Sequence, residues 1–116
     1  MPQFALFFRM DILSPDAQPS AEEMEVRMAS WMEWLGWIES QGKLVEGGNH
    51  FASKGAVLRP GGVVSKKPYV AENQSVAGLI MVRAKSLAEA VRLAQRCPIL
   101  DGEGTSVEVR EAANPS

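Results

Sequence analysis

The sequence predicts an α+β fold, in which two helices cover one face of a largely antiparallel sheet. Two observations predict it. Short apolar runs typical of strands alternate with two segments of helical periodicity. Each helical segment also opens on a serine followed three residues later by a glutamate, the spacing of a capping box. At 116 residues, the chain has the size of one domain with one core.

The first strand and the first helix have the clearest signals. Gln3–Met10 is rich in phenylalanine and leucine and predicts a buried strand. Ser20 with Glu23 predicts the start of a helix, and Gly42 is well placed to end it. Apolar side chains recur along this helix at helical spacing and predict its buried face: Met24, Met28, Trp31, Leu35 and Ile38.

The middle of the chain predicts three strands and a tight turn. Residues 43–48 form a short second strand. Residues 56–65 are two β-branched runs around Pro60-Gly61-Gly62, which predicts a hairpin. Val76–Ala84 is apolar at nearly every position, so it is expected to be a central strand.

The last third predicts a helix and a final strand. Ser86 with Glu89 repeats the capping-box spacing, and the helix is expected to stop before Pro98. In the strand that follows, Val107 and Val109 alternate with charged residues.

The order of these elements is the ferredoxin-like βαββαβ arrangement with an inserted hairpin. Ala5, Phe7 and Arg9 share one face of the first strand, and the opposite face is apolar as well. Two helices cover only one face of such a sheet, so the other face requires a second cover. We expect a homodimer in which the two sheets stack.

Composition excludes several classes of partner. The net charge is −2 and the basic residues are scattered, so we expect no nucleic-acid binding. The apolar opening is too short for a membrane span and carries Arg9 and Asp11, so we expect no membrane association and no signal peptide. Cys97 is the only cysteine, which fits a reducing, cytoplasmic compartment. Its place near a helix end favours a packed structural thiol.

Four segments together resemble a known family. They are "WMEWLGWIESQGKLVEGG", "GAVLRPGGVV", "KPYVAENQSVAGLIMVRAKSLAEAVRLAQRCPIL" and "GTSVEVREA". In this order they are similar to the YCII-related family, in particular its DGPF branch. The resemblance implies one domain over residues 1–112 with a tail at 113–116, and a dimeric α/β barrel built from two ferredoxin-like protomers.

The segment that gives the DGPF branch its name has changed here. The matching positions read Lys66-Lys67-Pro68-Tyr69, so the proline and an aromatic residue remain and the aspartate does not. Later positions that are acidic or lysine in the family hold Ala71, Asn73 and Gln74. General acid–base catalysis requires a group that changes protonation near the working pH. We therefore expect no catalysis by any route that relies on these groups. The family has no general activity that would name a reaction.

Other residues are candidates for a site. We expect small-molecule binding without catalysis, with an anionic or aromatic ligand held by Phe7, Arg9, Tyr69 and Arg110 between the sheet and the hairpin. The alternative for Arg9 is an ion pair with Glu108 across the sheet, and this is the interpretation we favour.

Two further functions stay open. A cofactor-free enzyme would use His50 and Tyr69 for proton transfer, although a histidine on the glycine-flanked loop around residue 50 is more often simply solvated. A protein-interaction module linked to transcription would present Trp37, which lies off the predicted apolar face. This possibility follows from the resemblance, because some DGPF proteins are encoded beside sigma factors. One histidine and one cysteine in unrelated segments predict no metal site, and we expect no cofactor.

Overall fold

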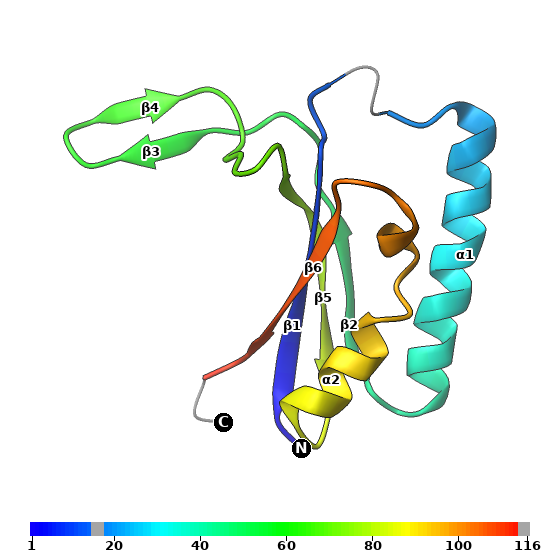
Figure 1. Cartoon of the computed structure of the whole chain (residues 1–116). Coiled ribbons are helices and arrows are strands. Elements are labelled where there is room, and N and C mark those ends of the chain that lie inside the picture. Colours follow the sequence, from blue (N-terminus) through cyan, green and yellow to red (C-terminus); the bar gives the residue numbers. More distant parts are fainter. Residues whose placement is uncertain (15–17, 114–116) are drawn as a thin grey trace.

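The computed structural model describes residues 1–14 and 18–113. It has an α+β architecture in which a four-stranded antiparallel sheet carries its helices on one face (Figure 1). The strand order β2-β5-β1-β6 is consistent with the ferredoxin-like arrangement predicted from the sequence, and β3 and β4 form a separate two-stranded hairpin. The elements are β1 (Gln3–Met10), α1 (Ala21–Ser40), β2 (Leu44–His50), β3 (Val57–Arg59), β4 (Val63–Ser65), β5 (Ser75–Arg83), α2 (Leu87–Ala94), the 3₁₀ helix η2 (Pro98–Asp101) and β6 (Ser106–Glu111).

Strand β1 lies in the middle of the sheet and divides it into two faces. Phe4, Leu6 and Phe8 are buried beneath the helices. Ala5, Phe7 and Arg9 alternate with them, point to the face that has no helix over it and are half-buried. We call this second surface the open face. The alternation predicted from the sequence is confirmed, because successive side chains of a strand point to opposite sides.

Helix α1 begins as predicted. The Ser20 hydroxyl accepts a hydrogen bond from the Glu23 N–H at 3.2 Å, and the Glu23 side chain accepts from the Ser20 N–H. At the other end, Gly42 has a φ of +70°, the left-handed conformation that glycine adopts without strain.

The predicted buried face of α1 is only partly right. Trp34 and Ile38 are buried, whereas Met24 and Met28 each expose 47% of their surface. Helical spacing determines which side of a helix a residue occupies, but not how far the neighbouring elements extend. The core packs against the second half of α1 and leaves its first half uncovered.

The second predicted capping box is only half formed. The Ser86 hydroxyl accepts from the Glu89 N–H at 3.2 Å, as expected. The Glu89 carboxylate, however, accepts from the Lys85 N–H and forms an ion pair with Lys43 at 3.1 Å. That ion pair ties the start of α2 to the segment before β2.

Strand β2 is longer than predicted and irregular. It extends to His50, so this residue ends a strand instead of lying in a loop, which corrects the sequence interpretation. Its pairing with β5 shifts register twice. Gly48 has a φ of +68°, and a Cβ atom there would lie 1.6 Å from the Leu79 carbonyl oxygen. A glycine at this position lets the two backbones approach closely.

The β3–β4 hairpin forms as predicted and projects from the sheet on the side opposite α1 (Figure 1). Its turn uses Gly61 and Gly62, both at positive φ. A second tight turn precedes β5, where Ala71 and Gln74 exchange two backbone hydrogen bonds of 2.9 Å. We call residues 68–74 the signature turn. None of the described helices is both long and apolar enough to cross a membrane.

Candidate functional site

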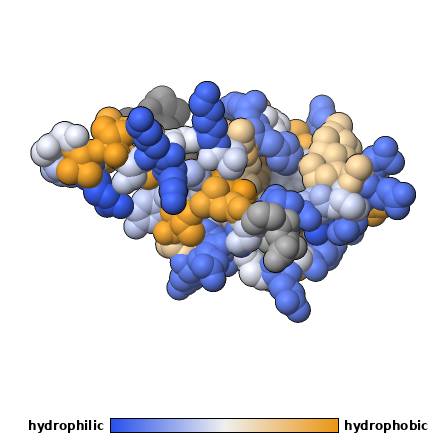
Figure 2. Space-filling model, turned by 90° about the horizontal axis from the view of Figure 1, so that it is seen from above, coloured by the Kyte–Doolittle hydropathy of each residue, from blue (hydrophilic) through white to orange (hydrophobic). Residues whose placement is uncertain are grey.

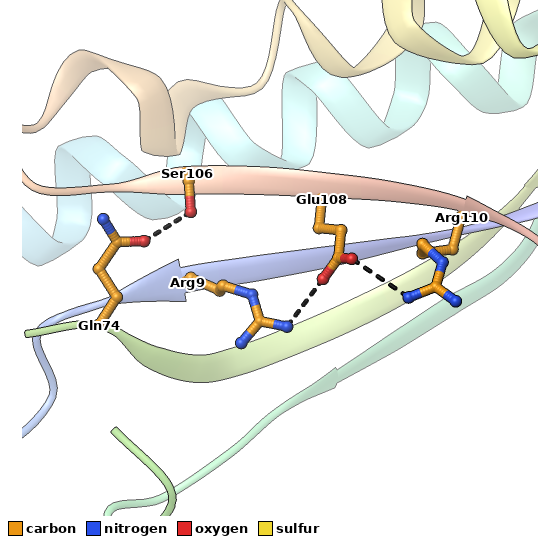
Figure 3. A network of polar contacts seen from close by, with 5 residues as sticks. All are labelled: Arg9, Gln74, Ser106, Glu108 and Arg110. Carbon is orange, nitrogen blue, oxygen red and sulfur yellow. Dashed lines mark hydrogen bonds and ion pairs between the residues drawn. The ribbon is translucent and has the colours of Figure 1, made fainter. Parts of the chain in front are cut away.

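A row of polar side chains runs along the open face where β1 meets β6 (Figure 3). Arg9 Nη2 donates to Glu108 Oε1 at 2.8 Å, and Arg110 Nη1 donates to Glu108 Oε2 at 3.3 Å. Both carboxylate oxygens are therefore held by guanidinium groups. The ion pair favoured from the sequence is confirmed, because antiparallel pairing places these alternate residues on one face.

The row is electrostatically unbalanced. Two guanidinium groups share one carboxylate, which leaves a local charge of +1. The hydrogen bond from Arg9, followed by that from Arg110, lowers the pKa of the Glu108 carboxyl below its ordinary value. Each guanidinium has five N–H donors, and these ion pairs engage one on each arginine. The remaining donors are available to an anion or to water.

Phe7 lies beside this row. It is in register with Glu108 on one side and with Leu79 of β5 on the other. Its ring is half-buried on the open face. The open face thus offers an aromatic surface next to guanidinium groups, which is suited to a small molecule with an apolar body and an acidic group.

The signature turn is attached to the end of the same row. Ser106 Oγ donates to Gln74 Oε1 at 2.5 Å, and Ser106 is in register with Arg9. Ser75 Oγ donates back to the Tyr69 carbonyl oxygen. The neutral amide of Gln74 joins the turn to β6 without adding charge.

Tyr69 lies apart from the row. The residue is 60% exposed, and its ring centroid lies 6.0 Å from the guanidinium carbon of Arg59, a residue of the hairpin. None of the contacts found in residues 1–14 and 18–113 joins the Tyr69 side chain to Phe7, Arg9 or Arg110. The structure brings three of the four predicted ligand-binding residues onto one face, and the ligand-binding role of all four stays a prediction.

His50 lies on the opposite side of the sheet. It pairs with Gly78, which pairs with the buried Phe8 of the helix-covered face. The His50 ring is 5.4 Å from that of Trp31 on α1. It is exposed, as the sequence predicts for a histidine in contact with solvent, but it does not share a face with Arg9 or Phe7.

A comparison with protein-family models matches the YCII-related domain over residues 8–113, nearly the whole chain. The chain belongs to the YCII-related domain family. The resemblance recognised from the sequence is confirmed at the level of this family. No curated protein matches the sequence significantly.

This YCII-related domain has a shallow pocket that the sequence did not reveal. It has a volume of about 160 Å³ and lies between the loop after β1 and the signature turn. Asp11 lines it, but one of its carboxylate oxygens accepts from the Ser14 and Leu13 N–H groups at 2.9 and 3.0 Å. These bonds, that from Ser14 foremost, lower the Asp11 pKa. An aspartate placed just after a strand and shortly before a serine is the sequence signal for this local cap.

A second pocket, of about 310 Å³, lies on the helix side and is mostly apolar. It is formed by α2, η2 and β6 and lined by Leu87, Val91, Ala94, Gln95, Leu100, Val107 and Val109. None of the four predicted ligand-binding residues lines either pocket. Neither of these two pockets thus includes the polar row of the open face of this YCII-related domain.

Two residues singled out in the sequence have structural explanations. Cys97 is 2% exposed, and burial raises the pKa of its thiol to about 12, as expected of a packed cysteine. Trp37 is half-buried against the core, and the guanidinium of Arg96 lies 4.2 Å from its ring centroid. Within the described ranges, no three histidine, cysteine, aspartate or glutamate side chains are arranged to hold a metal ion.

Proposed function

We propose that this YCII-related domain is a homodimeric, non-catalytic binding protein for a small molecule with an acidic group and an aromatic or apolar body. We further infer that it is a member of the DGPF branch that has lost its ionisable signature residues. The observation that carries the proposal is the sharing of Glu108 between Arg9 and Arg110 beside Phe7 on the open face.

The chemistry of the row supports binding over catalysis. A guanidinium stays protonated over the whole working pH range, and the pKa of Glu108 is lowered. Neither group is suited to exchange a proton near neutral pH. Arginine forks do recognise carboxylate and phosphate groups in fixed geometry. Tyr69, on the signature turn, is the fourth residue that we propose for the ligand.

A dimer would complete the site. Ala5, Leu79 and Met81 make the middle of the open face apolar and are half-buried. A second sheet stacked on this face would remove that surface from water and enclose the polar row between the two copies.

Ligand binding is tested with benzoate, inorganic phosphate and the neutral analogue benzyl alcohol as probes. We expect benzoate to raise the melting temperature in a concentration-dependent manner and benzyl alcohol to leave it unchanged. Arg110→Gln is expected to abolish the benzoate effect. Arg92→Gln, an exposed arginine on α2, is the matched control and is expected to keep it. No shift with either anion, or equal shifts in all three proteins, would contradict the proposal.

Dimerisation is tested separately by sedimentation equilibrium. Met81→Glu places a charge in the middle of the open face and is expected to give a monomer. Leu87→Glu adds the same charge at an exposed site on α2, across the sheet, and is expected to remain dimeric. A monomeric wild-type protein would refute the dimer.

A further inference from the structure

The β3–β4 hairpin is an exposed arm with two chemical features. We call residues 54–67 the hairpin arm. Leu58, Val63 and Val64 expose 75%, 51% and 55% of their surface. Figure 2, which views the molecule from above, shows this hydrophobic surface on the projecting hairpin at the left. The charged residues of the arm are all basic and exposed: Lys54, Arg59, Lys66 and Lys67.

A projecting arm of this kind needs support. An isolated two-stranded hairpin is at best marginally stable in water, and three or more strands or a packing partner are needed for independent stability. The β3–β4 pair is a sheet of its own, separate from the four-stranded one. Exposure of its three apolar side chains to water contributes no favourable free energy. The arm therefore has the features of a segment that packs against another surface.

The first half of α1 has the complementary features. Met24, Met28 and Met32 follow one another at intervals of four, so they lie along one side of the helix. They expose 47%, 47% and 62% of their surface. We call these three residues the methionine stripe. Methionine side chains adapt readily to the shape of an incoming surface.

Acidic side chains accompany the stripe. Between Ala21 and Glu33 the helix carries four glutamates and a single arginine. Glu22 and Glu25 are exposed and lie in the same turns as the first methionine. Three ion pairs form in the part of the chain that the structure describes, and they use neither these glutamates nor the basic residues of the arm. The two surfaces thus carry opposite charges that remain unpaired with each other.

The arm and the stripe lie at the same end of the molecule but on opposite sides of the sheet (Figure 1). The sheet separates them, so they do not meet within one protomer. A second copy that faces the open face, related by a two-fold axis along the strands, would place its own α1 in the direction in which the arm projects. One side of the arm has seven residues, from Lys54 to Pro60, and spans about 23 Å at about 3.3 Å per residue. Stacked sheets lie about 10 Å apart, so this length passes the partner sheet and reaches its helix layer.

We propose that the hairpin arm of each protomer docks on the methionine stripe of a second copy of the chain. A two-fold axis makes the contact reciprocal, so each dimer contains two of them. Leu58 and Val64 are in register and share one face of the hairpin, and this face meets the methionines. The basic residues of the arm face Glu22 and Glu25. The charges set the orientation and the choice of partner more than the affinity. This inference rests on the proposed homodimer, and it adds an exchange of arms to the stacking of the sheets.

The test is a charge swap between two variants. Lys66→Glu/Lys67→Glu lowers the net charge of the arm from +4 to 0 and places two glutamates opposite Glu22 and Glu25. Glu22→Lys/Glu25→Lys changes the net charge of residues 21–33 from −3 to +1. Each variant alone should dimerise at least about tenfold more weakly than the wild type, because both contacts then oppose like charges. When the two are mixed, a heterodimer pairs the reversed arm with the reversed helix and the native arm with the native helix. Native mass spectrometry with one variant ¹⁵N-labelled then measures the heterodimer fraction.

We expect the mixture to form mostly heterodimer, well above the half predicted by random exchange. A rescue of this kind cannot arise from a folding defect in either variant. Glu103→Lys/Glu111→Lys, at exposed acidic positions outside α1, is the matched control and should mix randomly with the arm variant.

The outcomes separate the two proposals. If the wild type is a dimer that Met81→Glu dissociates, but the charge variants dimerise normally or mix at random, the stacked dimer stands and the exchange of arms is refuted. The basic arm would then bind an acidic partner other than a second copy of the chain. If the wild type is a monomer, both proposals fail together.

Discussion

Glu108 receives a hydrogen bond from Arg9 on the neighbouring strand, with 2.8 Å between Oε1 and Nη2. The two residues are 99 positions apart in the sequence and meet because β1 and β6 pair side by side. The contact links one edge strand to the middle of the sheet and holds a carboxylate on the open face.

The first prediction concerns how this ion pair responds to pH. The folded-state pKa of Glu108 lies below its ordinary value of 4.5, so the charged form contributes stability above that pH. This contribution is lost as the pH falls through the folded-state pKa. We expect Glu108→Gln to melt at a lower temperature than the wild type at pH 7, and the difference to shrink below about pH 4.5.

Thermal melts from pH 7 to pH 3 measure this difference. Glu111→Gln is the matched control, because it removes a carboxylate from the same strand and takes part in none of the ion pairs found in the described chain. If the difference in melting temperature between Glu108→Gln and the wild type stays constant with pH, the ion pair is not its cause.

The second prediction concerns the close approach of β2 and β5. Gly48→Ala would place a methyl group 1.6 Å from the Leu79 carbonyl oxygen, at a φ of +68°. The strain and the clash together are expected to cost about 2 to 4 kcal/mol of unfolding free energy. At Gly47 an added Cβ meets nothing within 4 Å, so Gly47→Ala is the control and should change stability little. Urea denaturation measures the unfolding free energy of both variants. Equal losses of unfolding free energy in the two variants would refute the explanation.

The third prediction concerns the thiol. A pKa raised from 9.0 to about 12 lowers the thiolate fraction of Cys97 at pH 8 about a thousandfold, and burial restricts access as well. We expect iodoacetamide to modify the native protein only at the rate of unfolding, and to modify it promptly in urea. Ser53→Cys adds an exposed thiol that should react once under native conditions. Prompt double modification of this variant without denaturant would contradict the burial of Cys97.

The fourth prediction concerns the junction of the two helices. Trp34 Nε1 donates to the Leu93 carbonyl oxygen at 3.0 Å, which joins α1 to α2 through a buried bond. Trp34→Phe keeps most of the ring and removes the donor, so we expect a loss of about 1 to 2 kcal/mol. Trp37 lies on the same helix but is half-buried, so Trp37→Phe should lower the unfolding free energy by less. Chemical denaturation that ranks the two variants in the opposite order would refute this role.

The elements of this YCII-related domain were predictable because their signals are local. The Ser20 cap and the alternation along β1 each involve residues within a few positions of one another. The same alternation placed Arg9 and Glu108 on one face once both strands were recognised. The exposure of Met24 and Met28 was not predictable, because it depends on where distant elements end.

The candidate site was predictable only in part, for the same reason. The bond between Gln74 and Ser106 depends on the register of two strands and on a turn that folds back to meet them. Asp11 has a local signal, but its pocket requires the signature turn to lie across from it. Pairings of this kind depend on tertiary arrangement, which a single sequence does not specify.

The irregular pairing of β2 has a consequence for aggregation. A strand at the edge of a sheet exposes backbone groups that can recruit further chains into a continuous β-structure. The two register shifts in β2 bend that edge, and at the opposite edge β6 is six residues long and ends in Arg110 and Glu111. Both borders of the sheet are thus poor templates for an added strand. Growth of fibrils by strand addition at the borders of this sheet is therefore disfavoured.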